Sequence, residues 1–173
     1  NLCDGDVTSF IANSGLSTSN NSYVWSFGQS GQVVNSVLNA GSNDISLIVE
    51  NLNNLCRDTI KEIIEIFPKP IANFISTEVC LGDKTIFYDN SSNNVSEWAY
   101  NFGDGIGVSA NQDTEYTYYS PGIFNVNLNV ISNMGCESNI VQEVVVHHIP
   151  LVDFMIESHC EGKGNIFTNT SSV

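Results

Sequence analysis

The amino-acid sequence repeats itself with a period of about 80 residues, and this repeat restricts the fold more than any other feature. Residues 80–92 recur as residues 160–172, and each copy carries a cysteine, a glycine, an Ile-Phe pair and a Ser-Ser pair. Residues 70–74 (PIANF) recur at the same offset as residues 150–154 (PLVDF), and an earlier copy opens at Cys3. A period of this length predicts an array of small units that share one fold.

The repeat divides the chain into three modules. Residues 1–68 form a module that lacks its opening strand, residues 69–149 form a complete module, and residues 150–173 form the opening strands of a third, truncated module. We therefore expect the chain to be a segment cut from a longer array. The join at residues 67–70 (FPKP) is short and contains two prolines, so we expect that neighbouring modules do not swing freely.

Alternation of apolar and polar residues predicts β-strands. In residues 123–131 apolar side chains occupy every second position, the period of a strand with one buried face. Residues 58–67 (DTIKEIIEIF) contain helix formers, but they align with the β-branched residues 138–147 (SNIVQEVVVH), which favours a strand. The predicted fold is all-β, an antiparallel sandwich. The strands predicted in the complete module are residues 71–76, 85–90, 97–102, 114–119, 123–131 and 139–148.

Charge and hydropathy exclude several partners. The chain has 5 lysines and arginines against 19 aspartates and glutamates, a formal net charge of -14. This charge repels nucleic-acid backbones and anionic membrane surfaces, so we expect neither as a partner. No apolar run approaches the roughly 20 residues of a membrane-spanning helix, so we expect no membrane insertion.

The complete module resembles the PKD (polycystic-kidney-disease) repeat. The pattern of that family is an aromatic residue, any residue, Phe-Gly-Asp-Gly, a loop, and an alternating strand of the form Gly-x-Tyr-x-Val-x-Leu-x-Val. The residues that match are Tyr100, Phe102, Gly103, Asp104, Gly105, Gly122, Phe124, Val126, Leu128 and Val130. The first module keeps Trp25 and Phe27-Gly28, but Gln29-Ser30 replaces Asp-Gly.

The cysteines and the Pro-x-Ala-x-Phe opening make the chain similar to the tandem PKD repeats of very large secreted surface proteins, such as the SprB-like gliding-motility adhesins of Bacteroidota bacteria. This resemblance implies tandem immunoglobulin-like β-sandwiches arranged as a rod, exported across the outer membrane to the cell surface. It implies a structural or adhesive role in gliding or attachment, without enzymatic activity. The implied partners are neighbouring repeats of the same chain, and polysaccharide or surface proteins.

Five cysteines at repeat-equivalent positions predict disulfides in a secreted protein. The connectivity that the resemblance implies places Cys80 and Cys136 in turns at opposite ends of a sandwich. Strands between these turns span about 17 to 20 Å, more than a disulfide permits. We therefore prefer a bond from Cys3 to Cys136 across the join, with the partners of Cys56, Cys80 and Cys160 outside the chain. The alternative is pairing within modules, Cys3 with Cys56 and Cys80 with Cys136.

The sequence predicts no catalytic residues, no metal ligand set and no cofactor. Ca²⁺ is the cation that clustered carboxylates suit best, but their spacing fits no Ca²⁺-binding loop, and capping of turns is favoured. These carboxylates are Asp104 with Asp113 and Glu115, and Asp4 with Asp6. His147 and His148 are adjacent in a predicted strand, so they point to opposite faces and cannot bind one metal ion together.

Three residues are candidates for surface chemistry. Tyr116 and Tyr119 can stack on a sugar or a partner if they are exposed. Among Tyr116, Tyr118 and Tyr119, however, we expect one buried tyrosine whose hydroxyl bonds to the backbone. Thr59 lies in a short Asp-Thr-Ile run that resembles an O-glycan acceptor of Bacteroidota proteins. The leading hypothesis is a stiff, disulfide-supported spacer of a cell-surface filament. The alternatives are a carbohydrate-binding module and an accessory segment of a secreted hydrolase.

Overall fold

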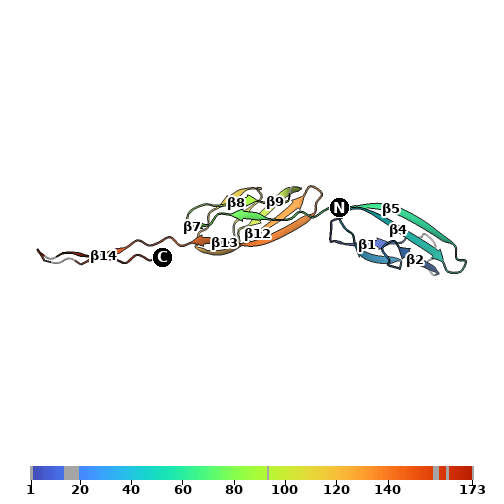
Figure 1. Cartoon of the computed structure of the whole chain (residues 1–173), viewed down its shortest axis with the longest axis horizontal. Coiled ribbons are helices and arrows are strands. Elements are labelled where there is room, and N and C mark those ends of the chain that lie inside the picture. The colour runs from blue at the N-terminus through green and yellow to red at the C-terminus, as the bar shows by residue number, and fades with distance from the viewer. Residues whose placement is uncertain (1, 14–19, 93, 158–159, 163, 173) are drawn as a thin grey trace. The chain divides into compact units, whose positions relative to one another are not determined.

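The computed structural model describes residues 2–13, 20–92, 94–157, 160–162 and 164–172. Within these residues the chain consists of strands, turns and loops and contains no helix (Figure 1). No helix long and apolar enough to cross a bilayer is therefore found in this part of the chain. The residues form two compact units. The first comprises Asn1–Pro70, Asn93–Ser96 and Ile131–Ser138, and the second comprises Ile71–Ser92, Glu97–Val130 and Asn139–Val173.

The first unit contains a small β-sandwich. One layer pairs β1 (Val7–Ile11) with β3 (Val33–Val37), and the other has β4 (Gly41–Asn51) between β2 (Asn21–Trp25) and β5 (Arg57–Ile66). Apolar residues at alternating positions turn from both layers into one core. The core residues are Phe10, Ala12, Tyr23, Trp25, Val34, Leu38, Ile45, Leu47 and Ile66.

The second unit is built on a larger sandwich. One sheet has the order β10-β9-β12-β13-β7 and the other the order β11-β8-β6. The alternation that predicted the strand over residues 123–131 is confirmed, because β12 turns Val126, Leu128 and Val130 into the core. The bounds are β6 Phe74–Ser76, β7 Val79–Cys80, β8 Thr85–Asp89, β9 Val95–Asn101, β10 Val108–Ser109, β11 Thr114–Tyr116, β12 Gly122–Ser132 and β13 Glu137–His147.

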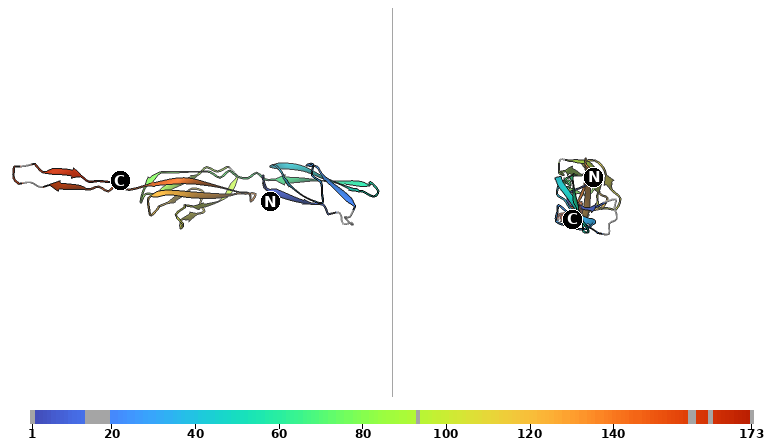
Figure 2. Two further views of the ribbon diagram at one scale, coloured as in Figure 1. Left: turned by 90° about the horizontal axis from the view of Figure 1, so that it is seen from below. Right: turned by 90° about the vertical axis from the view of Figure 1, so that its right-hand side faces the viewer.

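A separate pair of strands follows, β14 (Phe154–Glu157) and β15 (Ile166–Asn169), drawn in red in Figure 2. All of their residues are exposed. Phe154 lies opposite Asn169, just as Phe74 lies opposite Asp89 in the pairing of β6 with β8. The sequence repeat therefore extends to the register of strand pairing.

The predicted all-β class is confirmed, and most predicted strands are present with small shifts at their ends. Residues 58–67 form β5, so the strand was the correct choice over a helix. The predicted strand over residues 71–76 begins only at Phe74, after Pro70. The one over residues 114–119 ends at Tyr116, because the chain turns Tyr118 into the core there.

Candidate functional site

The Phe-Gly-Asp-Gly turn of the second unit is organised around the carboxylate of Asp104. Its Oδ1 accepts hydrogen bonds from the backbone N–H groups of Ile106 at 3.1 Å and Gly107 at 2.8 Å, and its Oδ2 accepts one from the Tyr116 hydroxyl at 2.5 Å. Burial alone would raise the pKa of Asp104, but these hydrogen bonds outweigh it and hold the pKa below its ordinary value. Asp104 therefore caps the turn, as the sequence favoured.

Two glycines in and just after this turn, Gly103 and Gly107, are required by close packing. A Cβ at Gly103 would overlap the backbone of Asn125, and Gly103 has a φ of 79°. A Cβ at Gly107 would overlap the ring of Tyr116. The motif therefore stabilises the sandwich, and its polar groups are directed at one another.

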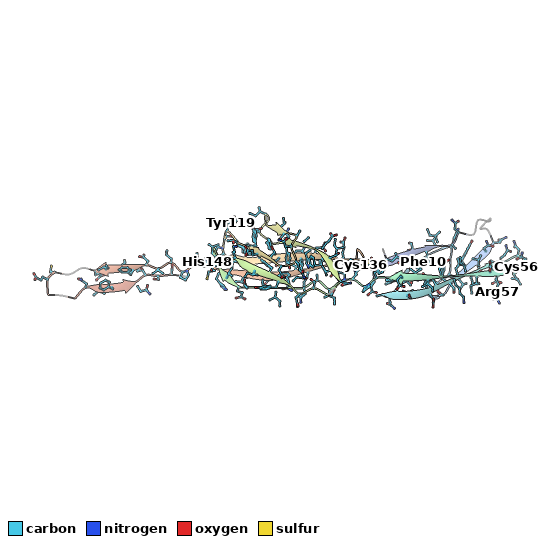
Figure 3. All side chains as sticks on the ribbon, turned by 90° about the horizontal axis from the view of Figure 1, so that it is seen from above. Phe10, Cys56, Arg57, Tyr119, Cys136 and His148 are labelled. Atoms are coloured by element: carbon cyan, nitrogen blue, oxygen red, sulfur yellow. A yellow bond between two sulfur atoms is a disulfide. The ribbon has the colours of Figure 1, made fainter. Side chains whose placement is uncertain are left out.

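The three tyrosines after β11 have different environments. Tyr116 is half-buried, and its ring stacks on Phe102 with centroids 4.2 Å apart. The hydrogen bond to Asp104, aided by burial, raises the pKa of Tyr116 to about 12. Tyr118 is buried and donates its hydroxyl to the Phe102 carbonyl at 3.0 Å, and burial raises its pKa. Tyr119 is 83% exposed (Figure 3).

These environments correct one of the two predicted surface contacts. Tyr116 is used inside the unit, because its ring and hydroxyl both have partners there. The ring of Tyr119 is exposed to solvent. The expected buried tyrosine bonded to the backbone is Tyr118.

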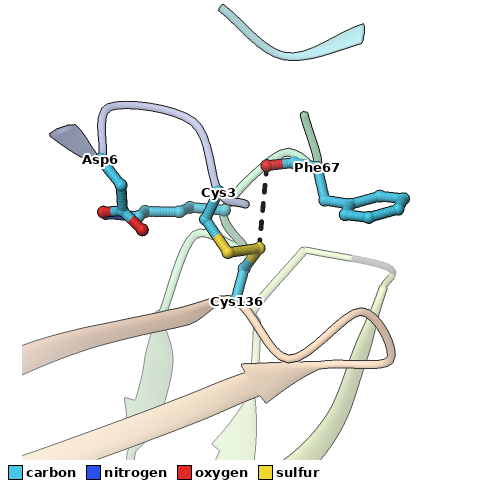
Figure 4. A network of polar contacts seen from close by, with 5 residues as sticks. Cys3, Asp6, Phe67 and Cys136 are labelled. Carbon is cyan, nitrogen blue, oxygen red and sulfur yellow. Dashed lines mark hydrogen bonds and ion pairs between the residues drawn. A yellow bond between two sulfur atoms is a disulfide. The ribbon is translucent and has the colours of Figure 1, made fainter. Parts of the chain in front are cut away.

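A disulfide in the first unit joins Cys3 to Cys136, with the Cα atoms 5.7 Å apart (Figure 4). Both cysteines are buried. The Sγ of Cys136 also lies 3.7 Å from the carbonyl oxygen of Phe67, and Lys69 forms an ion pair with Asp6 at 2.6 Å. This bond is the pairing that the sequence favoured.

Pairing within modules is absent from the structure, where Cys56, Cys80 and Cys160 are free and exposed. Strand length gives the reason. Cys80 lies opposite His147 at one end of β13, whereas Cys136 directly precedes the other end. A strand of 11 residues spans about 35 Å, far beyond the reach of a disulfide. That these three cysteines form disulfides with cysteines outside this sequence stays a prediction.

The carboxylates considered for Ca²⁺ have separate partners. Asp113 accepts the backbone N–H of Asp89 at 2.8 Å, Glu115 forms an ion pair with Lys84, and Asp4 accepts the N–H of Ala40 at 3.2 Å. Over the described part of the chain, no group of three or more His, Cys, Asp or Glu side chains is arranged to hold a metal ion.

The remaining sequence candidates lie on the surface. His147 is exposed and its Nε2 lies 3.4 Å from Glu78, while His148 is exposed beyond the end of β13. Thr59 is exposed on β5, where its backbone N–H donates to Asp58 at 2.8 Å. Its side chain is therefore accessible for modification, which stays a prediction.

The sequence did not identify two adjoining grooves on the first unit. One, of about 440 Å³, lies near Tyr23, Val49 and Arg57, and the other, of about 250 Å³, near Phe10 and Trp25. Both are lined by Ala12, Leu47 and Ile60. The repeat offers a signal for them, since the described residues of the first unit hold no copy of residues 70–74, whose Phe74 is buried in the second unit.

Comparison with known proteins finds a family match for part of the chain. Residues 68–147 match the family model described as PKD domain, so the chain contains a PKD domain. Among solved structures, the PKD1 domain of Vibrio anguillarum Epp is similar at 21% identity and a TM-score of 0.43, over 47% of this chain and 96% of that one. The PKD1 domain of the Vibrio cholerae metalloprotease PrtV is similar at 23% identity and a TM-score of 0.41, over 45% of this chain and 96% of that one.

A sugar-bound structure is also among the similar ones. SGBP-B of the Bacteroides ovatus mixed-linkage glucan utilization locus, in complex with a mixed-linkage heptasaccharide, is similar at 17% identity and a TM-score of 0.34, over 85% of this chain and 42% of that one. No curated protein matches the chain. The PKD domain together with the disulfide indicates an extracellular protein.

Proposed function

We propose that this chain is a load-bearing spacer of a large cell-surface protein, without catalysis of its own, in which the Cys3–Cys136 bond shortens the path of force. The bond closes a sequence separation of 133 residues. When the chain is pulled from its two ends, tension passes from Cys3 through the bond to Cys136. Residues 4–135 are then outside the loaded path, so their strands are protected from forced unfolding.

The short proline-containing join and the ion pair between Lys69 and Asp6 support this proposal, since both lie near the bond. Neighbouring repeats are the proposed partners along the chain, and a gliding or attachment adhesin is the proposed parent protein. In such an adhesin the spacer holds a binding region away from the cell and bears the load when that region engages polysaccharide or a surface protein.

Single-molecule stretching tests the proposal. A chain with Cys56→Ser, Cys80→Ser and Cys160→Ser, held at its two ends, is stretched with and without reductant. In the oxidised chain we expect only residues 1–3 and 136–173 to extend. Reduction should add roughly 450 Å of contour length, because 133 residues become extensible at about 3.4 Å each.

The matched control adds Cys3→Ser to the same background and should behave like the reduced chain without reductant. A contour length that does not respond to reductant would contradict the proposal, because all residues would then bear the load under both conditions.

A second candidate function is polysaccharide binding, and the exposure of Tyr119 favours it. On a glycan array we expect any binding of this kind to be lost in Tyr119→Ser and kept in Tyr88→Ser, a change to another exposed tyrosine. Binding that survives Tyr119→Ser would exclude this ring as the contact.

A further inference from the structure

The outer side of the layer formed by β1 and β3 is apolar and open to solvent. Its large side chains form two cross-strand pairs, Val7 with Val37 and Ile11 with Val33. Cross-strand partners point to the same side of a sheet, as do residues at every second position of a strand, so the two pairs share one surface. All four side chains are between 55% and 70% exposed. They form the aliphatic face of the first unit, and a contiguous apolar patch of this kind marks an interaction surface.

The second unit shows that an opening strand does not cover such a face. There β6 lies beside β8, the repeat counterpart of β1, within the same sheet, and Ile75 of β6 pairs with Tyr88 of β8. Ile75, Tyr88 and Ile86 on this side of the sheet are all exposed. A strand added to the layer therefore extends it sideways and leaves its outer side open. The exposure of the aliphatic face follows from the layer itself.

Charge is divided unevenly between the two layers of the first unit. The strands β1 (VTSFI) and β3 (VVNSV) contain no charged residue. The strands β4 and β5 of the other layer contain Asp44, Glu50, Arg57, Asp58, Lys61, Glu62 and Glu65. Two copies of a chain with a net charge of -14 repel each other, and the repulsion is smallest where two charge-free surfaces meet. The aliphatic face is therefore the side of this unit on which a second copy can approach most closely.

The polar pair at the centre of the aliphatic face is complementary to itself. Ser9 lies opposite Asn35, midway between the two aliphatic pairs, and its hydroxyl donates to the Asn35 Oδ1. The Asn35 Nδ2–H groups have no acceptor among the described residues. A two-fold axis between two such faces brings each Ser9–Asn35 pair against its own copy, so each amide can donate to the Oδ1 of the other. The aliphatic pairs on either side then meet aliphatic pairs.

We propose that the aliphatic face binds the same face of a second copy of this chain, about a two-fold axis through the Ser9–Asn35 pairs. The two layers then pack face to face, and this isologous contact closes at two copies. The face lacks the aromatic ring that stacks on a sugar, and the net charge opposes an anionic bilayer. Four aliphatic side chains bury less than the roughly 800 Å² per partner of a stable dimer, so we expect a Kd on the order of 1 mM. The proposal does not depend on the load-bearing role.

Disulfide trapping detects a contact of this strength. In a background with Cys56→Ser, Cys80→Ser and Cys160→Ser, the change Ser9→Cys places a thiol at the proposed axis, where it faces its own copy. With oxidised glutathione as the oxidant, we expect Ser9→Cys to form disulfide-linked dimers about tenfold faster or more than Thr59→Cys, the matched change at an exposed residue of β5. Added salt should speed the trapping, because it screens the repulsion between acidic chains. Equal rates for the two variants overturn the proposal.

A charge placed on the aliphatic face tests whether the trapped dimer uses it. Val33→Glu, added to Ser9→Cys, buries a carboxylate in the contact and should slow trapping by about tenfold or more. Val24→Glu, the matched change at an exposed valine of β2 in the other layer, should change the rate little. Both valines are exposed, so denaturant unfolding should show that both variants remain folded. Trapping that is indifferent to Val33→Glu overturns the proposal. A chain that traps no dimer but binds neutral phosphatidylcholine vesicles overturns the assignment to a second copy.

Discussion

The two units share an aromatic stack but close their turns by different chemistry. In the second unit Tyr100 and Phe102 are stacked 6.1 Å apart at 13° between their planes, and in the first unit Trp25 and Phe27 are stacked 5.9 Å apart at 16°. The turn after Phe102 is capped by the Asp104 carboxylate. The corresponding turn of the first unit is closed by backbone hydrogen bonds, among them Gly28 N–H to the Trp25 carbonyl at 3.0 Å.

The difference shows which part of the motif the fold requires. The rings are kept in both units because they occupy the core between two sheets, where a change of volume leaves a cavity. The turn can lose its aspartate because backbone groups satisfy each other there. The Asp-Gly of the motif therefore adjusts stability, while the stacked aromatics determine the fold.

The sharpest test of this comparison is to remove the shared core ring from each unit. Phe87→Ala should destabilise the second unit by about 3–5 kcal/mol, because Phe87 contacts three rings in a closed core. Phe10→Ala should cost the first unit less, about 2–3 kcal/mol, because Phe10 already borders a groove. Denaturant unfolding measures both, with Trp98 reporting the second unit and Trp25 the first.

The control is the tryptophan of the unchanged unit. The midpoint of the unfolding curve that it reports should shift little. Equal losses in the two units would contradict the comparison, since they would mean that the groove of the first unit does not weaken its core.

A glycine pair separates turn conformation from packing. Gly103 and Gly28 have φ values of 79° and 82°, so alanine is strained at both. At Gly103 a Cβ would also overlap Asn125, whereas at Gly28 a Cβ meets nothing within 4 Å. We expect Gly103→Ala to cost about 2–4 kcal/mol and Gly28→Ala about 1 kcal/mol, measured by the same unfolding curves. A similar cost at both positions would assign the effect to φ alone.

The strands were predicted well because the alternation of apolar and polar residues is a local signal, and the repeat allows a clear copy to support an unclear one. Residues 58–67 could be assigned to a strand only because the later copy, residues 138–147, alternates clearly. The pairing of Cys3 with Cys136 was predicted from the connectivity that the PKD resemblance implies, which puts Cys80 and Cys136 at opposite ends of a sandwich, farther apart than a disulfide reaches.

Other features depend on three-dimensional packing that sequence patterns do not record. Tyr116 and Tyr118 occupy the same face by alternation, yet the chain leaves the strand after Tyr116 and gives the two hydroxyls different partners. The grooves of the first unit were not predicted, because their apolar lining depends on which residues of the two layers face each other. The close approach of Gly103 to Asn125 is likewise a contact between the turn after β9 and the strand β12.

The smallest expected effect concerns the turn cap itself. Asp104→Asn should destabilise the second unit by about 1 kcal/mol at neutral pH, because the charged acceptor of three hydrogen bonds is lost. The pKa of Asp104 is lowered in the folded protein, so its contribution is present above the ordinary aspartate pKa of about 4 and is lost as pH falls below it. The difference between wild type and variant should therefore narrow from pH 7 to pH 3 in the Trp98 unfolding curves.

The same pair of groups gives an independent measurement at alkaline pH. The hydrogen bond to Asp104, with burial, raises the pKa of Tyr116 to about 12, so the stability from the neutral phenol is present below about pH 10 and is lost as pH rises toward 12. In Asp104→Asn the negative acceptor is absent, and the Tyr116 phenol should ionise nearer pH 10. Ultraviolet titration of phenolate absorbance in the two proteins measures this shift, and Tyr116→Phe identifies which step belongs to Tyr116. If Asp104→Asn leaves that step unchanged, Asp104 does not accept the hydrogen bond of the Tyr116 hydroxyl, and the aspartate then gives the turn of the second unit no stronger cap than the first unit has.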